Sequence, residues 1–192
     1  MGAGKGLAFL FMKTYLKSER LIFREWSDDD REPFARMNAD PLVMQYLPRS
    51  LNEKESNHLV DKFQKHLEKH DYGFFAVEVA ETGGFAGFVG LNRVPFEAPF
   101  QSSEIPPVEI AWRLDYEVWG QGYGSEAAKA VLDFGLNDLD LEEVVSFTVH
   151  DNARSIHMME KIGMKRDKGG DFHYPTLPEG HPLGDFVLYR AS

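Results

Sequence analysis

Cysteine is absent from this chain of 192 residues, and so are long hydrophobic runs. Without cysteine the protein can form no disulfide bond, no thiolate metal site and no cysteine nucleophile. The longest apolar run, Leu7 to Met12, is far shorter than the ~20 residues that a membrane-spanning helix needs. Several enzyme classes are therefore excluded, and nothing indicates a membrane helix.

Basic residues are also in short supply. Lys and Arg number 21 against 31 Asp and Glu, which gives a formal net charge of −10. A field of that sign repels phosphate, so general binding of nucleic acid or of an anionic membrane is disfavoured. The same field suits a cationic partner such as an amine or a basic peptide.

Length and composition favour one globular domain. Hydrophobic residues make up 43% and charged residues 27% of the chain, which are ordinary values for a protein with a full-sized core. Residues 1–11 resemble a signal peptide only faintly, because their apolar part is short and no small-residue cleavage site follows. We expect a leader of unknown role at residues 1–11, one domain over residues 12–192, and a cytoplasmic protein.

Hydrophobic patterning predicts a mixed α/β fold. Alternating or continuous apolar runs predict strands at residues 20–25, 74–80, 85–94, 108–114, 143–149 and 186–189. Capping residues and helical spacing predict helices at residues 28–38, 50–70, 125–137 and 152–162, the second opening with a capping box from Ser50 to Glu53. An antiparallel first half is thus followed by a strand–helix–strand–helix second half.

Three alternating glycines, Gly120, Gly122 and Gly124, stand between the predicted strand at 108–114 and the helix at 125–137. Glycine lets the backbone turn tightly and approach a ligand closely. The free N–H groups of the helix start, with the positive end of its dipole, then form an anion site whose usual occupant is phosphate. A glycine-rich turn that only redirects the chain is the alternative interpretation.

Two common phosphate motifs do not fit this cluster. A P-loop ends in Gly-Lys-Ser/Thr, which the cluster lacks. In the dinucleotide fingerprint Gly-x-Gly-x-x-Gly the third glycine comes one residue later than here, and its acidic partner ends the next strand. Asp140 lies at the right distance but precedes that strand. Dinucleotide binding is therefore the poorer interpretation.

Three segments resemble the GNAT N-acetyltransferases. Residues 119–124 (WGQGYG) are similar to the family's pyrophosphate loop, Gln/Arg-x-x-Gly-x-Gly/Ala. Residues 152–164 resemble its Asn-x-x-Ser segment, which continues to Glu-Lys-apolar-Gly-Phe. Residues 18–24 (SERLIFR) are similar to the Rim-type subgroup, which includes N-acetyltransferases of ribosomal-protein amino termini.

The resemblance has two departures. Trp119 stands where the family usually has Gln or Arg, which removes one phosphate contact. Met159 stands where many members carry a tyrosine general acid. In the Rim-type subgroup a serine of the Asn-x-x-Ser segment is the more usual candidate, which points to Ser155.

The resemblance implies a single-domain α+β GNAT fold, with a mixed, mostly antiparallel sheet that has a V-shaped split and is flanked by helices. It implies acetyl-CoA as co-substrate, no metal, and direct attack by a primary amine in a ternary complex. The acceptor is then a protein N-terminus or a small amine, and the enzyme a monomer or homodimer. The residues implied to bind CoA are Trp112, Arg113, Leu114, Trp119, Gly120, Gln121, Gly122, Tyr123, Gly124, Ser125, Asn152 and Ser155.

Glu109 and Ser155 are the candidate catalytic residues. A protonated amine cannot attack, so a base must take its proton directly or through water. Strand alternation places Glu109, Ala111 and Arg113 on one face, which we expect to be the cleft face. The alternatives are a solvated charge for Glu109, with a water chain or His150 as proton acceptor, and helix-start hydrogen bonding for Ser155.

Two other functions stay open on the sequence alone. A CoA-binding sensor without catalysis would share the fold and would explain the missing tyrosine. A nucleotide-dependent oxidoreductase is less favoured by the glycine spacing. His66 and His70 have the spacing of a metal pair, but the His-Glu-x-x-His pattern is not met, and we interpret both as solvated helix residues.

Overall fold

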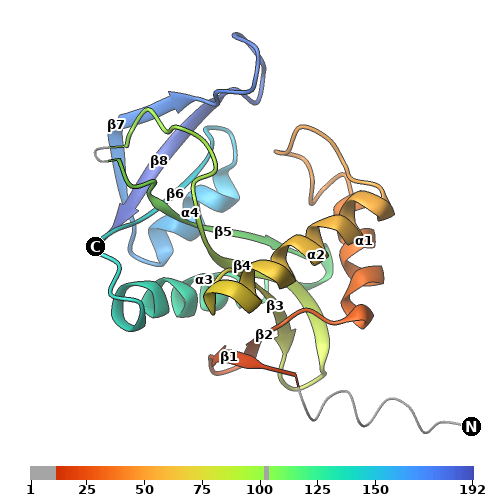
Figure 1. Ribbon diagram of the computed structural model, residues 1–192. Coiled ribbons are helices and arrows are strands. Elements are labelled where there is room, and N and C mark those ends of the chain that lie inside the picture. The colour runs from red at the N-terminus through yellow and green to blue at the C-terminus, as the bar shows by residue number, and fades with distance from the viewer. Residues whose placement is uncertain (1–11, 102–103) are drawn as a thin grey trace, which may run out of the picture.

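The computed structural model describes residues 12–101 and 104–192, and the leader expected at residues 1–11 lies outside this range. Eight strands form one sheet in the order β1-β2-β3-β4-β5-β6-β8-β7 (Figure 1). All neighbouring strands run antiparallel except β5 and β6, which are parallel. The strands are β1 (Thr14–Lys17), β2 (Leu21–Arg24), β3 (Phe74–Val79), β4 (Gly84–Arg93), β5 (Val108–Leu114), β6 (Val144–Val149), β7 (Lys165–His173) and β8 (Asp185–Ala191).

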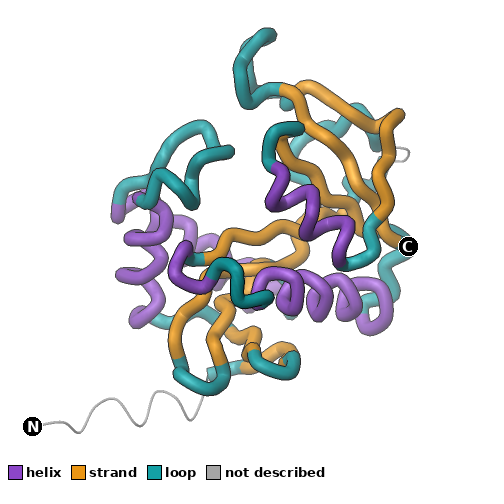
Figure 2. Tube along the Cα trace, turned by 180° about the vertical axis from the view of Figure 1, so that it is seen from behind, coloured by secondary structure: helices purple, strands orange, loops and turns teal. Residues whose placement is uncertain are grey.

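Four α-helices cover the two faces of this sheet. They are α1 (Arg31–Ala39), α2 (Glu53–His70), α3 (Tyr123–Asp133) and α4 (Ala153–Lys161). Helices α1 and α2 pack on one face, and α3 and α4 lie on the opposite face, which is turned toward the viewer in Figure 2. The expected mixed, mostly antiparallel sheet flanked by helices is confirmed. Within the described ranges, no helix is long and apolar enough to cross a membrane.

The elements with the clearest patterns lie where the sequence predicts them. Strand β5 has the predicted bounds, whereas β1 and β7 were not predicted. Strand β7 reads KRDKGGDFH, a polar run without alternation, because it lies at the sheet edge and pairs only with β8. The capping box of α2 is formed by Asn52 and Glu55 and corrects the predicted pair, Ser50 and Glu53.

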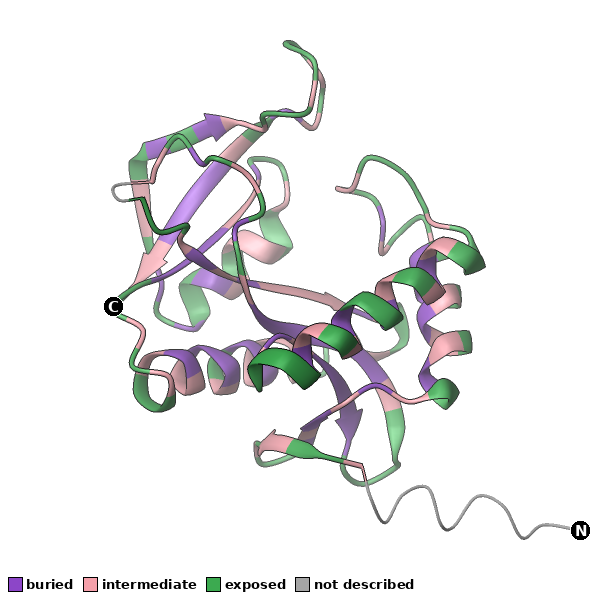
Figure 3. Cartoon of the chain, in the orientation of Figure 1, coloured by how far each residue is buried: buried purple, intermediate pink, exposed green. Residues whose placement is uncertain are grey.

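An aromatic core fills the space between α1, α2 and the sheet. Trp26, Phe34, Phe63 and Phe88 are buried, and their ring centroids lie 4.9 to 6.4 Å apart. Figure 3 shows buried residues along the central strands and exposed ones on the outer side of α2. This packing fixes α1 and α2 over one face of the sheet, where they border the site described below.

A buried ion cluster ties β2 to β3 and to the short helical turn Asp28–Asp30. Arg24 donates to Glu78 at 2.7 Å and to both carboxylate oxygens of Asp30 at 2.7 and 2.9 Å. All three side chains are buried. Removing one member of such a cluster leaves uncompensated charge in a poorly solvated place, which costs more than the intact pair contributes.

Strands β5 and β6 part after a short paired stretch. Their pairing is limited to Val108 with Val144 and Glu109 with Val145. One residue further, the Ser146 hydroxyl donates to the Ile110 carbonyl at 3.0 Å, and beyond that contact the strands diverge. The expected V-shaped split is thus located between the C-terminal halves of the two parallel strands.

We expect Arg24→Met to lower the unfolding free energy by about 3–5 kcal/mol, because Asp30 and Glu78 would stay buried without their cation. Urea denaturation measures this loss. Arg49→Met removes an exposed arginine that pairs with Glu55 and serves as the control, and it should leave the unfolding midpoint almost unchanged. A loss below about 1 kcal/mol in Arg24→Met would show that the cluster does not stabilise the fold.

Candidate active site

The open edge of β5 presents backbone hydrogen-bonding groups to the gap between β5 and β6. Val94 donates to the Pro107 carbonyl and Asp115 to that of Ala86, so odd-numbered β5 residues bond to β4. In a strand the groups of successive residues point to opposite sides. The N–H and C=O groups of Trp112 and the N–H of Leu114 therefore point into the gap, whereas those of Arg113 point to β4.

The glycine loop follows directly and leads into α3. Gly120 and Gly122 have φ of +75° and +83°, a region that favours glycine, and Gly122 is the N-cap of α3. Gly124 has a different role, because a side chain there would lie 2.9 Å from the Met158 sulfur and 3.0 Å from Leu114. Two glycines thus shape the loop, and the third lets α3 pack closely.

Arg20, which directly precedes β2, contacts the glycine loop and was not identified from the sequence. Its Nη1 donates to the Gln121 carbonyl at 3.0 Å, and its Nε pairs with Glu126 in the first turn of α3 at 2.7 Å. Its guanidinium also lies 4.5 Å from the centre of the Tyr123 ring. The segment SERLIFR carried the only signal for it, as part of a family resemblance without an assigned role.

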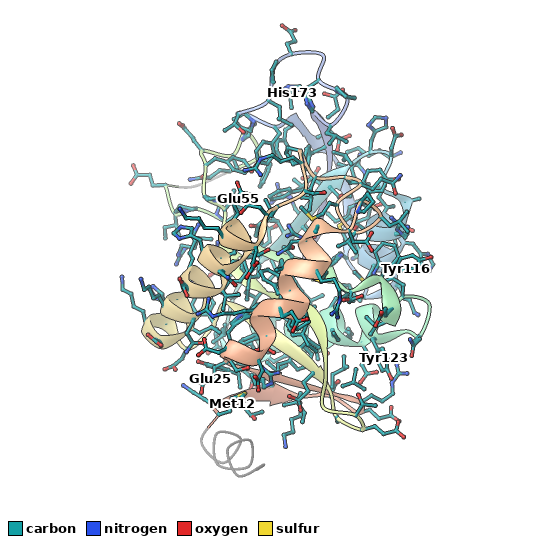
Figure 4. All side chains as sticks on the ribbon, turned by 90° about the vertical axis from the view of Figure 1, so that its right-hand side faces the viewer. Met12, Glu25, Glu55, Tyr116, Tyr123 and His173 are labelled. Atoms are coloured by element: carbon teal, nitrogen blue, oxygen red, sulfur yellow. The ribbon has the colours of Figure 1, made fainter. Side chains whose placement is uncertain are left out.

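Aromatic and cationic side chains border the loop. Trp119 donates from Nε1 to the Leu114 carbonyl at 3.0 Å, and the Arg154 guanidinium lies 4.1 Å from the Trp119 ring centre. Gln121 donates to the Glu117 carbonyl at 3.0 Å. Tyr116 and Tyr123, which are labelled in Figure 4, lie on the same side of the molecule as this loop. The loop is therefore held by side chains on both of its flanks.

The start of α4 lies on the other arm of the split. Asn152 caps the helix, because its Oδ1 accepts from the Ser155 N–H at 3.3 Å. Its Nδ2 donates to Thr148 on β6 at 2.9 Å and to the Ser155 Oγ at 3.1 Å. Asn152 is thus the N-cap of the helix that the sequence predicts at residues 152–162. Since the Ser155 oxygen already accepts a hydrogen bond, the serine proton is available for another acceptor.

Glu109 lies on the α1–α2 face of β5, as strand alternation predicts. Ile110 and Leu114 point into the core, and no register shift interrupts β5. Burial raises the pKa of Glu109 to about 7. The same carboxylate contributes to the raised pKa of Tyr174, whose shift is caused chiefly by burial. A carboxylate with this pKa changes protonation state near neutral pH.

The histidines considered in the sequence analysis lie away from the split or are exposed to solvent. His150 pairs with its neighbour Asp151 at 3.1 Å, and its side chain is 57% exposed. His66 and His70 stack on α2 with ring centroids 4.6 Å apart. His70 is exposed as expected, but the His66 Nε2 is buried without a hydrogen-bond partner among the described residues, which corrects the interpretation of His66 as solvated. In the part of the chain that the structure describes, no three His, Cys, Asp or Glu side chains gather as a metal site would require.

Three features therefore meet at the split. A strand edge offers backbone donors and acceptors, and a glycine loop leads into a helix start with free N–H groups. On the face of β5 away from that helix, a carboxyl group has a pKa of about 7. This combination suits an extended, phosphate-bearing ligand that threads the gap and a second reactant that arrives from the α1–α2 face.

Comparisons with known sequences agree with this geometry. Residues 20–165 match the family model described as the acetyltransferase (GNAT) domain. The protein YkkB of Bacillus subtilis is 29% identical over 157 residues, which cover 81% of this chain and 88% of the relative. The spermidine N(1)-acetyltransferase of Escherichia coli K12 is 29% identical over 106 residues, covering 55% of this chain and 52% of the relative.

Solved structures share the fold. An acetyltransferase of the GNAT family from Bacillus anthracis superposes with a TM-score of 0.74 at 26% identity, covering 93% of this chain and 98% of that one. The ribosomal L7/L12 α-N-protein acetyltransferase RimL, in complex with coenzyme A, gives a TM-score of 0.69 at 16% identity over 93% and 97% of the two chains. At that identity the second comparison shows a likeness of fold alone.

We expect inorganic pyrophosphate to raise the melting temperature of the protein, because an anion that binds only the folded state stabilises it by mass action. Gly122→Val should abolish the rise, since valine is strained at φ +83° and its Cβ approaches Arg20 to 3.3 Å. Differential scanning fluorimetry measures both.

The matched control is Gly163→Val at the end of α4, where φ is +94° and no atom lies within 4 Å of the added Cβ. It carries similar backbone strain away from the loop, so pyrophosphate should still stabilise it. An equal pyrophosphate shift in Gly122→Val and wild type would place the anion site elsewhere.

Proposed function

Because the chain belongs to the GNAT acetyltransferase family and is an acetyl-CoA-dependent N-acetyltransferase, we propose that it moves the acetyl group directly to a primary amine within a ternary complex. The observation that carries the proposal is the position of Glu109, a carboxyl group with a pKa of about 7 on the strand that borders the split. Without cysteine, an acetyl-cysteine intermediate is excluded.

The glycine loop is proposed to hold the pyrophosphate of CoA. The N–H groups at the start of α3, between Gly120 and Ser125, supply the donors, and the helix dipole favours the anion. Arg20 fixes the loop through the Gln121 carbonyl, while its charge is paired with Glu126 at the start of α3. We therefore propose that Arg20 positions the loop and that the backbone N–H groups bind the phosphates.

The edge of β5 is proposed to bind the pantetheine arm. The Trp112 N–H and C=O and the Leu114 N–H point into the gap, where an extended amide chain can pair with them as a strand would. An N–H on this edge also polarises the thioester carbonyl, on which negative charge develops during attack. We propose both roles for Trp112 and Leu114 rather than Arg113, because the alternation along β5 turns the Arg113 backbone groups toward β4.

Glu109 is proposed to accept the proton of the attacking amine, directly or through water. A base works best when its pKa lies near the working pH, and burial has moved Glu109 to that range. Its carboxyl lies on the face of β5 away from α3 and the glycine loop, so base and cofactor anchor flank the reacting atoms from two sides.

Ser155 is proposed to donate a hydrogen bond to the departing thiolate. Its oxygen accepts from Asn152, so its proton is free to point into the split. Asn152 orients this hydroxyl while it caps α4, and a contact of Asn152 with CoA is compatible with both roles.

The relatives indicate the chemical class of the acceptor. One relative acts on spermidine and one structural neighbour on a ribosomal protein N-terminus, which supports a small amine or a protein N-terminus here. A desolvated carboxyl of raised pKa beside the split favours an enzyme over a CoA sensor, since binding alone does not require it.

The function is tested by mixing the protein with acetyl-CoA and a panel of amines and N-terminal peptides, and by following the release of free thiol. The protein has no thiol of its own, so the assay has no protein background. We expect turnover with at least one primary amine. CoA binding with no thiol release on any amine would favour the sensor.

We expect Glu109→Gln to lower kcat ~10²-fold or more, because the amide cannot accept the proton. For the wild type, kcat/KM should fall as the pH drops below about 7, the pKa of Glu109, since the base is then protonated. In the variant this fall in kcat/KM below pH 7 should vanish, while the pH dependence set by the acceptor amine should remain. CoA affinity should change little.

The same variant has a stability signature. Glu109 binds its proton more tightly in the folded state, so the stability linked to it is present below the unfolded pKa, ~4.3, and is lost as the pH rises to about 7. The gain in melting temperature of Glu109→Gln over wild type should therefore be larger at pH 8 than at pH 5.5. Wild-type kcat in the variant across pH 6–9 would overturn the role of Glu109.

We expect Ser155→Ala to lower kcat more than it raises the KM for acetyl-CoA, because a hydrogen bond to the leaving thiolate strengthens in the transition state. Steady-state kinetics at saturating acceptor measure kcat and the KM for acetyl-CoA separately. Thr148→Val removes the other hydroxyl that accepts from Asn152 and serves as the control, with a smaller effect on kcat. Weaker CoA binding with unaltered kcat would reassign Ser155 to cofactor binding or capping.

A further inference from the structure

The side chain of Arg113 lies on the same face of β5 as that of Glu109. Its Nη1 donates to the Asn38 Oδ1 on α1 at 2.6 Å, and the Asn38 Nδ2 donates to the Ser56 hydroxyl on α2 at 2.7 Å. Asn38 and Ser56 are fully buried. The guanidinium is therefore held in one place by the two helices that border the proposed acceptor side.

Within the described part of the chain, the charge of Arg113 has no counterion. Among residues 12–101 and 104–192, no carboxylate lies within 4.0 Å of its guanidinium, and donors other than Nη1 have no hydrogen-bond partner. Burial lowers its pKa to about 10, so it stays protonated at neutral pH. Arg24, the other arginine held close to the core, pairs with two carboxylates. The Arg113 guanidinium also lies 5.5 Å from the centre of the Phe88 ring. A partly buried cation without a counter-charge is costly, which makes its place a natural receptor for an anion.

We propose that Arg113 binds a carboxylate of the acceptor, so that the substrate carries an acidic group as well as the amine. The proposal rests on the proposed function, which places the amine near Glu109. Glu109 and Arg113 lie four residues apart on one strand face, about 13 Å between Cα atoms. Ala111, whose side chain is a methyl group, stands between them and leaves room for the substrate to span both.

This assignment separates acceptor classes. An amino acid, or a peptide N-terminus followed by an acidic residue, places one carboxylate within reach of Arg113 and gains a charge-assisted, two-pronged contact. A polyamine would place a second ammonium group against an uncompensated guanidinium, and like charges in a desolvated pocket repel. The net charge of −10 attracts amines in general, while Arg113 selects among them.

The test is isothermal titration of ω-amino acids of increasing length, from β-alanine upward, and of their carboxamides into the CoA-loaded protein. Each pair differs by one negative charge. We expect the best carboxylate probe to bind at least 10-fold more tightly than its carboxamide, as suits a charge-assisted contact worth ~1.5–3 kcal/mol. In Arg113→Gln, which keeps a donor for Asn38, the preference should vanish, and in Arg113→Lys part of it should persist.

The titration measures binding without turnover. The carboxylate subsite can therefore be disproved while acetyl transfer is confirmed, and acetyl transfer can be disproved while the subsite is confirmed. Equal binding of acids and carboxamides by the wild type would overturn the carboxylate subsite. So would a preference that survives in Arg113→Gln, or the loss of CoA affinity in that variant, because the side chain would then serve the fold or the cofactor. Tighter binding of spermidine than of every ω-amino acid would assign the pocket to polyamines.

Discussion

The parting of β5 from β6 is the constraint on which the rest of the molecule depends. Two parallel neighbours in one sheet pair over two residues and then separate, after the Ser146 hydroxyl bonds to the Ile110 carbonyl. Backbone groups in a sheet need partners, and the N–H and C=O of Trp112 and the N–H of Leu114 have no neighbouring strand to pair with beyond this point. A fold that keeps such an edge inside the molecule has a place for a strand-like ligand, and we propose an anion site at one end of it, in the loop that follows β5.

The buried and partly buried charged residues differ in whether their charges are paired. Arg24 stands buried between two carboxylates, which is a stabilising arrangement and offers nothing to a ligand. Glu109 and Arg113 are partly buried, yet neither has an opposite charge beside it among the described residues, and burial moves both pKa values toward neutrality. Groups left in this state cost stability, and they lie together on the face of β5 that looks toward α1 and α2. We therefore propose a structural role for Arg24, whose charge is paired, and functional roles for Glu109 and Arg113, whose charges are not.

The sequence predicted most of what local chemistry determines. The bounds of β5, the glycine loop and the Asn152 cap were found because each has a pattern within a few residues. Strands β1 and β7 were missed because edge strands need not alternate. The packing role of Gly124, the contact of Arg20 with Gln121 and the unpaired state of Arg113 arise from residues far apart in the chain. No window of sequence contains both members of these contacts.

The central claim is that a CoA ligand pairs with the open edge of β5. Amide hydrogen exchange, followed residue by residue with and without CoA, tests it most directly, because the alternation along β5 gives neighbouring residues opposite responses. The account predicts that CoA slows exchange at Trp112 and Leu114, whereas Ala111 and Arg113, which already bond to β4, change little. Equal protection along the whole strand, or protection at Ala111 and Arg113 alone, would contradict it.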